Sequence, residues 1–259
     1  MIIHQAKART KRLIKSQLLY GRFPRRVYRF GRKRSGDELV VVMCLWNRPE
    51  RLAKILDLLD SQNLSGGVRL YLWNNNRAEH TEYLATLARY QPTGALLSVE
   101  IVKSPYNLGA IARFYWVRRL VLGGYAGPIV VLDDDQDITP EFLSIASANY
   151  RPDTLTAWWA FSVGQGYWDR QPALVGGRVD YAGTGGMICN SEIFRDRSFF
   201  TGVPERFWML DDMWLNHFAK IHGYKLAKLP VEIEFVMHET NQFHTQIYLK
   251  EEFYEYLSS

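Results

Sequence analysis

Four carboxylates follow directly after a short apolar segment near the middle of the chain. They are Asp133, Asp134, Asp135 and Asp137, and the segment before them, Ile129 to Leu132, is mostly β-branched and is typical of a buried strand. The acids therefore lie at the carboxyl end of a strand, where open α/β sheets place their ligands. Clustered carboxylates repel one another unless a cation lies among them, and Mg²⁺ and Mn²⁺ prefer such oxygen ligands. This favours a metal site for a phosphorylated substrate over the alternative, an acidic turn at a helix start.

Alternating strands and helices in the first half of the chain must position these acids. The expected strands are Leu39 to Leu45, Val68 to Trp73, Leu97 to Val102 and the segment before the acids. This alternation predicts an α/β fold with a central, mostly parallel sheet flanked by helices. Each strand is followed by polar residues, which meet at one edge of the sheet and outline a cleft of nucleotide size. Before the aspartates these residues are Trp46, Asn47, Arg48, Asn74, Asn75, Asn76 and Asn107.

The second half of the chain is less regular. We expect strands at Thr156 to Val163, Ala173 to Val179, Met187 to Cys189, Leu226 to Leu229 and Ile233 to Met237, and a helix from Asp211 to Gly223. The end, Ile247 to Leu257, reads as a terminal helix or an ordered flap. We therefore divide the chain into a basic N-terminal arm (1–36), one α/β domain (37–240) and a C-terminal tail or flap (241–259). There is no GxGxxG and no GxxxxGK[ST] motif, which argues against a dinucleotide fold or a P-loop.

Composition points to an ordinary globular protein in a reducing compartment. The 259 residues are 47% hydrophobic and 23% charged. Cys44 and Cys189 both lie in apolar surroundings and are expected to be buried thiols, which suits a cytoplasmic location. We find no secretory signal pattern, and no apolar run approaches the roughly 18 residues of a membrane span.

Positive charge is concentrated in the arm. Residues 1–36 contain 12 Lys or Arg and no acid, whereas the remaining 20 basic and 27 acidic groups give the body a formal charge of −7. Apolar residues such as Leu13 and Ile14 are interleaved with the basic ones, which suits a helix lying on an anionic membrane surface. A solvated arm, a helix packed on the body and a nucleic-acid contact are the alternatives.

Five motifs in order resemble glycosyltransferase family 2, the nucleotide-diphospho-sugar transferases with a GT-A fold. The resemblance covers roughly residues 38–240. The motifs are Asn47-Arg48-Pro49 after the first strand, Asn107-Leu108-Gly109 with Arg113, the DxD segment Asp133-Asp134-Asp135, Gly185-Gly186-Met187 followed by Ile193-Phe194-Arg195, and a closing run of Glu205-Arg206-Phe207, Asp211-Asp212, Gly223-Tyr224-Lys225 and His238.

The resemblance implies a metal-dependent, inverting transfer of a sugar from a nucleotide diphosphate, with a UDP-sugar as the expected donor. Mn²⁺ or Mg²⁺ is then held by Asp133 and Asp135, with His238 as an additional ligand, and neutralises the leaving diphosphate. The general base that takes the acceptor hydroxyl's proton falls on Asp212. Asp211 stands where the family usually has Glu, which shortens the reach and leaves the assignment open between the two.

The resemblance also assigns the donor and acceptor sides. The donor-binding residues are Trp46, Asn47, Arg48, Asn74, Asn107, Gly109, Arg113, Asp133 and Asp134. Asn74 departs from the Asp that the family often has, so the base is open. Gly185, Gly186 and Trp158 form the acceptor side, with Trp158 or Trp159 stacking on a sugar or packing in the core. The acceptor is an unidentified glycan, lipid, protein or nucleic acid, and His244 and Lys250 of the tail could close over the diphosphate.

Two other functions fit parts of the pattern. A sugar-phosphate nucleotidyltransferase has a similar sheet, but it usually carries a Gly-rich basic loop where this chain has Trp46 to Pro49. A non-catalytic module with a transferase-like fold would dock to a membrane or nucleic acid through the basic arm. The intact acidic clusters argue against lost catalysis.

Overall fold

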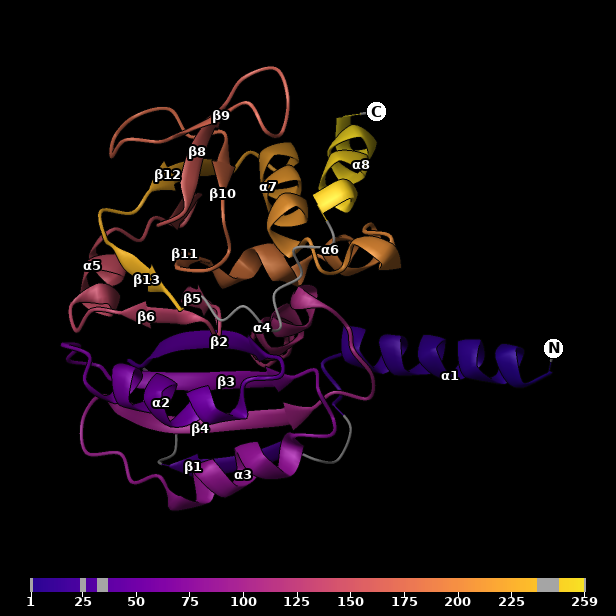
Figure 1. Ribbon diagram of the computed structural model, residues 1–259, viewed down its shortest axis with the longest axis vertical. Helices are drawn as coiled ribbons and strands as arrows, with labels where there is room; N and C mark the ends of the chain where they lie inside the picture. The colour runs from indigo at the N-terminus through magenta and orange to yellow at the C-terminus, as the bar shows by residue number, and fades with distance from the viewer. Residues whose placement is uncertain (1, 24–26, 32–36, 237–246, 259) are drawn as a thin grey trace.

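A large mixed sheet runs through the computed structural model, which describes residues 2–23, 27–31, 37–236 and 247–258 (Figure 1). Its strand order is β1-β4-β3-β2-β5-β11-β7-β12. The strands are β1 (Val27–Gly31), β2 (Leu39–Leu45), β3 (Val68–Asn74), β4 (Leu96–Lys103), β5 (Pro128–Leu132), β7 (Thr154–Ala157), β11 (Met187–Asn190) and β12 (Lys225–Lys228). Neighbouring strands from β4 to β5 are parallel, whereas β1 and β11 run antiparallel to their neighbours. The predicted mostly parallel central sheet is confirmed.

Helices cover both faces of this sheet (Figure 1). The described helices are α1 (Ile2–Leu19), α2 (Leu52–Asp60), α3 (His80–Arg89), α4 (Arg113–Leu122), α5 (Phe142–Ala148), α6 (Ser198–Thr201), α7 (Asp211–Ile221) and α8 (Ile247–Ser258), with 3-10 turns η1 (Pro49–Arg51), η2 (Ala110–Ala112), η3 (Ser191–Arg195) and η4 (Glu205–Phe207). Successive strand residues point to opposite faces, so Val40 and Val42 join the core under α4 and α7. Val41 and Met43 join a second core under α2, α3 and α5.

Two small sheets are built from the second half of the chain. One has the order β10-β8-β9 and contains β8 (Ala160–Val163), β9 (Arg170–Pro172) and β10 (Tyr181–Ala182). The other pairs β6 (Gln136–Ile138), which follows the acidic turn, with β13 (Ile233–Phe235). The three-stranded sheet lies at the top of the molecule in Figure 1, beside α7 and α8.

Two strand predictions in this half are wrong. The expected strand Thr156 to Val163 is two strands, β7 and β8, which belong to different sheets. The break falls at Trp158, whose backbone N–H donates to the Gly186 carbonyl at 2.9 Å. The expected strand Ala173 to Val179 is a loop, because Leu174 and Val175 are exposed and Gly177 closes a turn onto Leu174. Apolar residues in an exposed loop can give the same sequence pattern as a strand.

The basic arm packs on the body of the protein through α1 and through β1. The last turn of α1 buries Leu18 and Leu19, and the buried Arg118 of α4 donates a hydrogen bond to the Leu19 carbonyl at 2.7 Å. Further on, β1 pairs antiparallel with β4 at the edge of the sheet, a strand that the sequence analysis did not expect. The domain boundary at residue 36 stays a prediction. None of the described helices combines the length and hydrophobicity that crossing a bilayer requires.

The C-terminal segment forms the terminal helix that was one of its two predicted structures. Phe253 of α8 is fully buried and stacks on Phe207, with ring centroids 4.2 Å apart. Arg206 and Glu252 add an ion pair at 2.6 Å. The helix is thereby held beside the start of α7, where the acidic pair lies.

Candidate active site

A cleft of about 540 Å³ opens at the carboxyl ends of β2 and β5. These two strands are neighbours although β3 and β4 lie between them in the sequence, so the cleft is at a topological switch point of the sheet. Nine predicted site residues line it: Trp46, Arg48, Asn107, Arg113, Asp133, Asp134, Asp135, Asp211 and Asp212. The structure therefore brings together residues from four separate segments of the chain.

A buried ion pair connects the loops after β2 and β5. Arg48 Nη1 lies 2.6 Å from Asp134 Oδ1, and both side chains are almost fully buried. The Trp46 backbone N–H donates to the other carboxylate oxygen at 2.8 Å. Burial raises the pKa of Asp134 to about 7, although Arg48 and the Trp46 N–H oppose the rise. Both oxygens of Asp134 thus have partners within the protein, and this acid connects the loop after β2 to the loop after β5.

A second buried cation, Arg113 at the start of α4, links the acidic turn to α7. Its Nη1 lies 2.6 Å from Asp133 Oδ1 and also donates to the Leu132 carbonyl at 3.0 Å. Its Nε lies 3.3 Å from Asp211 Oδ2. Because one guanidinium contacts both acids, the end of β5 and the start of α7 are held at a fixed separation.

The two acids that open α7 lie in different environments. Asp211 is buried, and this burial raises its pKa to about 7 against the opposing charge of Arg113. Asp212 is only partly buried and accepts a hydrogen bond from the Met213 N–H at 2.8 Å on Oδ1 and one from the Tyr181 hydroxyl on Oδ2. Of the pair, Asp212 therefore has the more accessible carboxylate at the cleft.

Two carboxylates of the acidic turn remain available to a cation. Asp133 and Asp135 expose 33% and 22% of their side chains, although Asp133 also pairs with Arg113 at 2.6 Å and Asp135 with Arg48 Nη2 at 3.5 Å. A Cβ on Gly185 would lie 2.3 Å from Asp133 Oδ2, so the glycine leaves room beside this oxygen. Divalent Mg²⁺ is commonly held by one or two carboxylates together with substrate phosphates, and this pair fits that pattern. Among the described residues no three His, Cys, Asp or Glu side chains converge as metal ligands, and the predicted ligand His238 lies outside them.

The asparagines of the donor side are placed differently from one another. Asn107 is exposed and lines the cleft. Asn74 is fully buried at the end of β3, where its amide contacts His80 Nδ1 at 3.1 Å, and its neighbour Asn75 lines the cleft instead. Asn47 has a left-handed backbone with φ 56° and accepts a hydrogen bond from Asn76, 2.6 Å away. Asn47 and Asn74 thus stabilise the loops around the cleft and do not line it.

The predicted glycines act through the backbone. Gly109 has φ 73°, and a Cβ there would lie 2.6 Å from the Trp208 carbonyl oxygen. Gly186 has φ 79°, and its N–H donates to the Val131 carbonyl at 2.8 Å, next to the acidic turn. Both positions require glycine for close approach of two segments. They shape the walls of the cleft without lining it.

On the acceptor side the two tryptophans have separate environments. Trp158 is 6% exposed and belongs to the core, so the predicted acceptor-side residue does not line the cleft. Trp159 is 40% exposed and lines it together with Phe235, with ring centroids 5.5 Å apart. The chain bends at this pair, so the two rings lie side by side with centroids 5.1 Å apart, and only Trp159 reaches the cleft.

Two further basic side chains, Arg170 and Lys250, line the cleft. The sequence analysis did not assign Arg170 to the site, and it proposed Lys250 only as part of a tail that closes over the diphosphate. Arg170 of β9 lies over the rings of Phe161 and Tyr167, at 4.7 Å and 5.0 Å. Lys250 of α8 lies 5.9 Å from the Trp168 ring centroid. Neither makes an ion pair with a carboxylate in the part of the chain that the structure describes. Lys250 was expected near the diphosphate from its place in the tail; no sequence signal marked Arg170, and His244 lies outside the described residues.

The charged side chains that line the cleft nearly balance, with one acid in excess. Four are basic and five are acidic. The basic residues are Arg48, Arg113, Arg170 and Lys250, and the acids are Asp133, Asp134, Asp135, Asp211 and Asp212. Since two of the four cations are already paired with carboxylates, a polyanionic ligand would need further positive charge in order to bind.

Known structures share this fold, although no family model and no curated protein sequence matches the chain. Residues 1–349 of the S. aureus glycosyltransferase TarS in complex with UDP superpose with a TM-score of 0.53 and 16% identity, over 74% of this chain and 57% of that chain. A second TarS 1–349 structure gives a TM-score of 0.52 and 16% identity, over 74% and 58%. This chain thus spans less than two thirds of these relatives. The likeness confirms the predicted GT-A fold.

We expect the contribution of Asp134 and Asp211 to the stability of the protein to fall as pH rises from about 4 to about 7. Asp134 and Asp211 have folded-state pKa values of about 7, above the value of about 4 in an unfolded chain. Their stabilising contribution is therefore complete below pH 4 and is lost as pH rises through 7, at up to about 1.4 kcal/mol per pH unit for each group. Asp211→Asn should flatten this slope in urea unfolding, whereas Glu251→Gln on the exposed face of α8 should not. Equal slopes in wild type and Asp211→Asn would contradict the assignment.

Proposed function

We propose that this protein is an inverting glycosyltransferase that moves a sugar from a nucleotide diphosphate donor, with a UDP-sugar as the expected donor, to an acceptor hydroxyl. The observation that carries the proposal is the convergence of Asp133, Asp135, Arg113 and Asp212 in one cleft, at the switch point of a GT-A sheet. The UDP in the TarS complex supports the donor class. No described contact favours the alternatives, a sugar-phosphate nucleotidyltransferase or a non-catalytic module.

Asp212 is the general base in this proposal. Its carboxylate takes the proton of the acceptor hydroxyl while the hydroxyl oxygen attacks C1 of the donor sugar from the face opposite the diphosphate. The bond between C1 and the phosphate oxygen breaks, and the nucleoside diphosphate leaves with the electron pair. Asp211 is assigned to holding Arg113, because it is buried against that guanidinium.

Asp133 and Asp135 are the residues that would hold Mn²⁺ or Mg²⁺, and His238 stays a predicted third ligand. A divalent cation at this place would neutralise the leaving diphosphate. The excess of carboxylates over basic side chains in the cleft supports this requirement. Arg170 and Lys250 would add positive charge from the opposite wall. Since Arg48 is already neutralised by Asp134, we assign it to shaping the donor site and not to binding phosphate.

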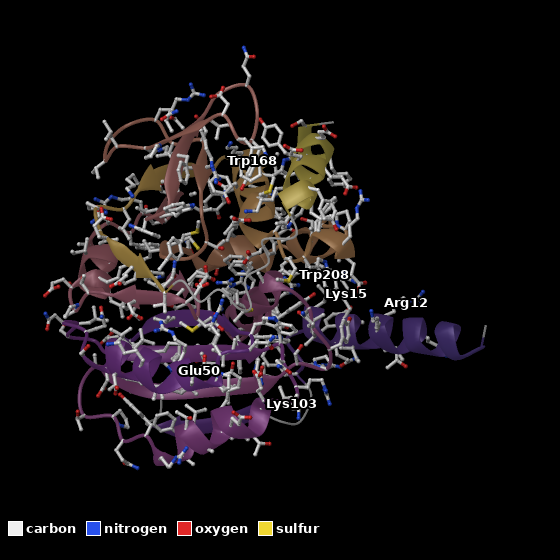
Figure 2. All side chains as sticks on the ribbon, in the orientation of Figure 1. Arg12, Lys15, Glu50, Lys103, Trp168 and Trp208 are labelled. Carbon is white, nitrogen blue, oxygen red and sulfur yellow. The ribbon has the colours of Figure 1, made fainter. Side chains whose placement is uncertain are left out.

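We also propose that α1 docks the protein on an anionic membrane surface, as a cytoplasmic, peripheral protein. The helix projects from the body, which it contacts through Lys15 over Trp208 and through an ion pair of Lys11 with Glu205 at 3.3 Å (Figures 1 and 2). Arg9 and Arg12 are exposed, and Leu13 is 61% exposed between basic residues. Basic charge around an exposed apolar residue is complementary to anionic lipid headgroups. The acceptor, a glycan, lipid, protein or nucleic acid, would be met from this position.

UDP together with Mn²⁺ should raise the melting temperature by a few degrees. At a UDP concentration of 100 times its dissociation constant, binding adds about 2.7 kcal/mol to the free energy of unfolding. Asp133→Asn with Asp135→Asn should abolish the part of this shift that depends on Mn²⁺. Asp137→Asn is the matched control, because Asp137 belongs to the same acidic turn but pairs with Arg51 at 2.6 Å and does not line the cleft. The absence of any shift with UDP and Mn²⁺ in wild type would refute the donor site.

Asp212→Asn should lower the turnover of the donor sugar by roughly 10²- to 10⁴-fold, the usual contribution of a general base. The affinity for UDP should remain, since Asp212 has no assigned contact with the nucleotide. Asp211→Asn should instead weaken the Arg113 contact and lower stability. Turnover can be followed by UDP release from a panel of UDP-sugars. A wild-type rate in Asp212→Asn would exclude this residue as the base.

Arg9→Gln with Arg12→Gln should weaken binding to phosphatidylserine vesicles about 30-fold, since each basic residue near an anionic surface contributes about 1 kcal/mol. Cosedimentation at low and high salt measures this, and the wild-type affinity should fall with salt. The control, Lys54→Gln with Arg89→Gln, changes the net charge equally at exposed positions of α2 and α3. Equal loss in both variants would show a net-charge effect and no specific role of α1.

A further inference from the structure

Tyr181 of β10 contacts Asp212, the proposed base. It is 7% exposed, and its hydroxyl donates to Asp212 Oδ2, while Oδ1 accepts the Met213 N–H. A carboxylate oxygen has two lone pairs, so each oxygen keeps one site for another proton donor. Because Asp212 lines the cleft, these remaining sites are available to an acceptor hydroxyl.

A second set of hydrogen bonds fixes β10 relative to the first turn of α7. Asn216, one helical turn after Asp212, accepts the Ala182 N–H at 2.8 Å and donates to the Ala182 carbonyl at 2.6 Å. The same amide group donates to the Asp212 carbonyl at 2.7 Å. The residue after Tyr181 is thus joined to the backbone of Asp212 through one buried side chain. The tyrosine hydroxyl and the carboxylate are therefore held in register.

We propose that Tyr181 is a positioning residue that fixes the Asp212 carboxylate in the orientation needed to accept the proton of the acceptor hydroxyl. The inference rests on the proposed function and extends it to a residue outside the motifs that suggested it. A hydrogen bond to a charged acceptor is stronger than one between neutral groups, and it restricts rotation of the short aspartate side chain. Proton abstraction depends on such alignment, since the base must reach the hydroxyl at hydrogen-bond distance.

Tyr181 is not itself the base. Burial raises the pKa of its hydroxyl well above the usual value, and the neighbouring Asp212 raises it further. The phenol therefore stays protonated and donates to Asp212 both before and after the carboxylate receives the acceptor's proton. Tyr167 packs edge-on against Tyr181, with ring centroids 5.9 Å apart, and Phe161 lies on the paired strand. Phenylalanine at position 181 would fill the same space, so Tyr181→Phe removes the hydroxyl with little change in packing.

The test compares kcat and KM of Tyr181→Phe with those of wild type, using the UDP-sugar that wild type turns over. We expect kcat to fall about 10- to 100-fold, while the KM for the donor and the Kd for UDP stay within about twofold. In an Asp212→Asn background the same substitution should have no further effect, because both changes act through one carboxylate. Tyr125→Phe is the matched control. Tyr125 is equally buried, at 7%, but its hydroxyl donates to the Pro128 carbonyl, and its loss should leave kcat unchanged.

The outcomes separate this inference from the proposed function. If wild type binds UDP and Asp212→Asn is inactive, but Tyr181→Phe has the wild-type kcat, Tyr181 does not position the base and the glycosyltransferase assignment stands. An equal additional loss in the Asp212→Asn background would likewise overturn the positioning role. A wild-type protein that neither binds UDP nor turns over any UDP-sugar would refute the proposed function itself. Unchanged affinity of Tyr181→Phe for UDP confirms that the variant's cleft is folded.

Discussion

The buried guanidinium of Arg113 is the interaction on which the rest of the site depends. A charge removed from water costs several kcal/mol unless it is paired and its remaining donors are satisfied. Arg113 meets this requirement only when Asp133, Asp211 and the Leu132 carbonyl surround it. The loop before α4, the end of β5 and the start of α7 must therefore come together whenever the chain folds. Arg48 imposes a similar constraint between β2 and β5 through Asp134.

The acids of the cleft form two groups, one buried against arginine side chains and one partly accessible from the cleft. Asp134 and Asp211 are buried and engaged by arginine, and burial raises the pKa of both to about 7. Asp135 and Asp212 are partly accessible, and Asp133 has one oxygen on Arg113 and the other beside Gly185. The middle acid of the DxD segment is thus buried in an ion pair with Arg48, while the outer two are partly exposed to the cleft. Asp134 and Asp211 can lie buried within this acidic cluster because each is paired with an arginine, Asp134 with Arg48 and Asp211 with Arg113.

The parts predicted well from sequence are those in which local pattern and tertiary position agree. The fully buried strands β2 and β3 read as continuous apolar segments, and the acids after β5 fall at the sheet edge as expected. The strand β1 was missed because its alternation is short and lies in a basic segment. Asn74 was assigned to the cleft one residue early, since β3 extends to include it. Pairs such as Arg48 with Asp134 join residues 86 positions apart, and no local pattern specifies them.

Both wrong strand predictions lie in the second half of the chain, and this has a physical cause. The first half is built from regular strand–helix units whose buried faces set the hydrophobic period. The second half includes the short strands β8, β9 and β10, their loops and α8, which are held by tertiary contacts such as the hydrogen bonds of Asn216 with Ala182 and show no regular hydrophobic pattern. Loops on a rigid scaffold commonly carry specificity. Tyr181, Trp159, Arg170 and Lys250 all belong to this part, so under the proposed function the residues nearest the acceptor would lie where sequence patterns are weakest.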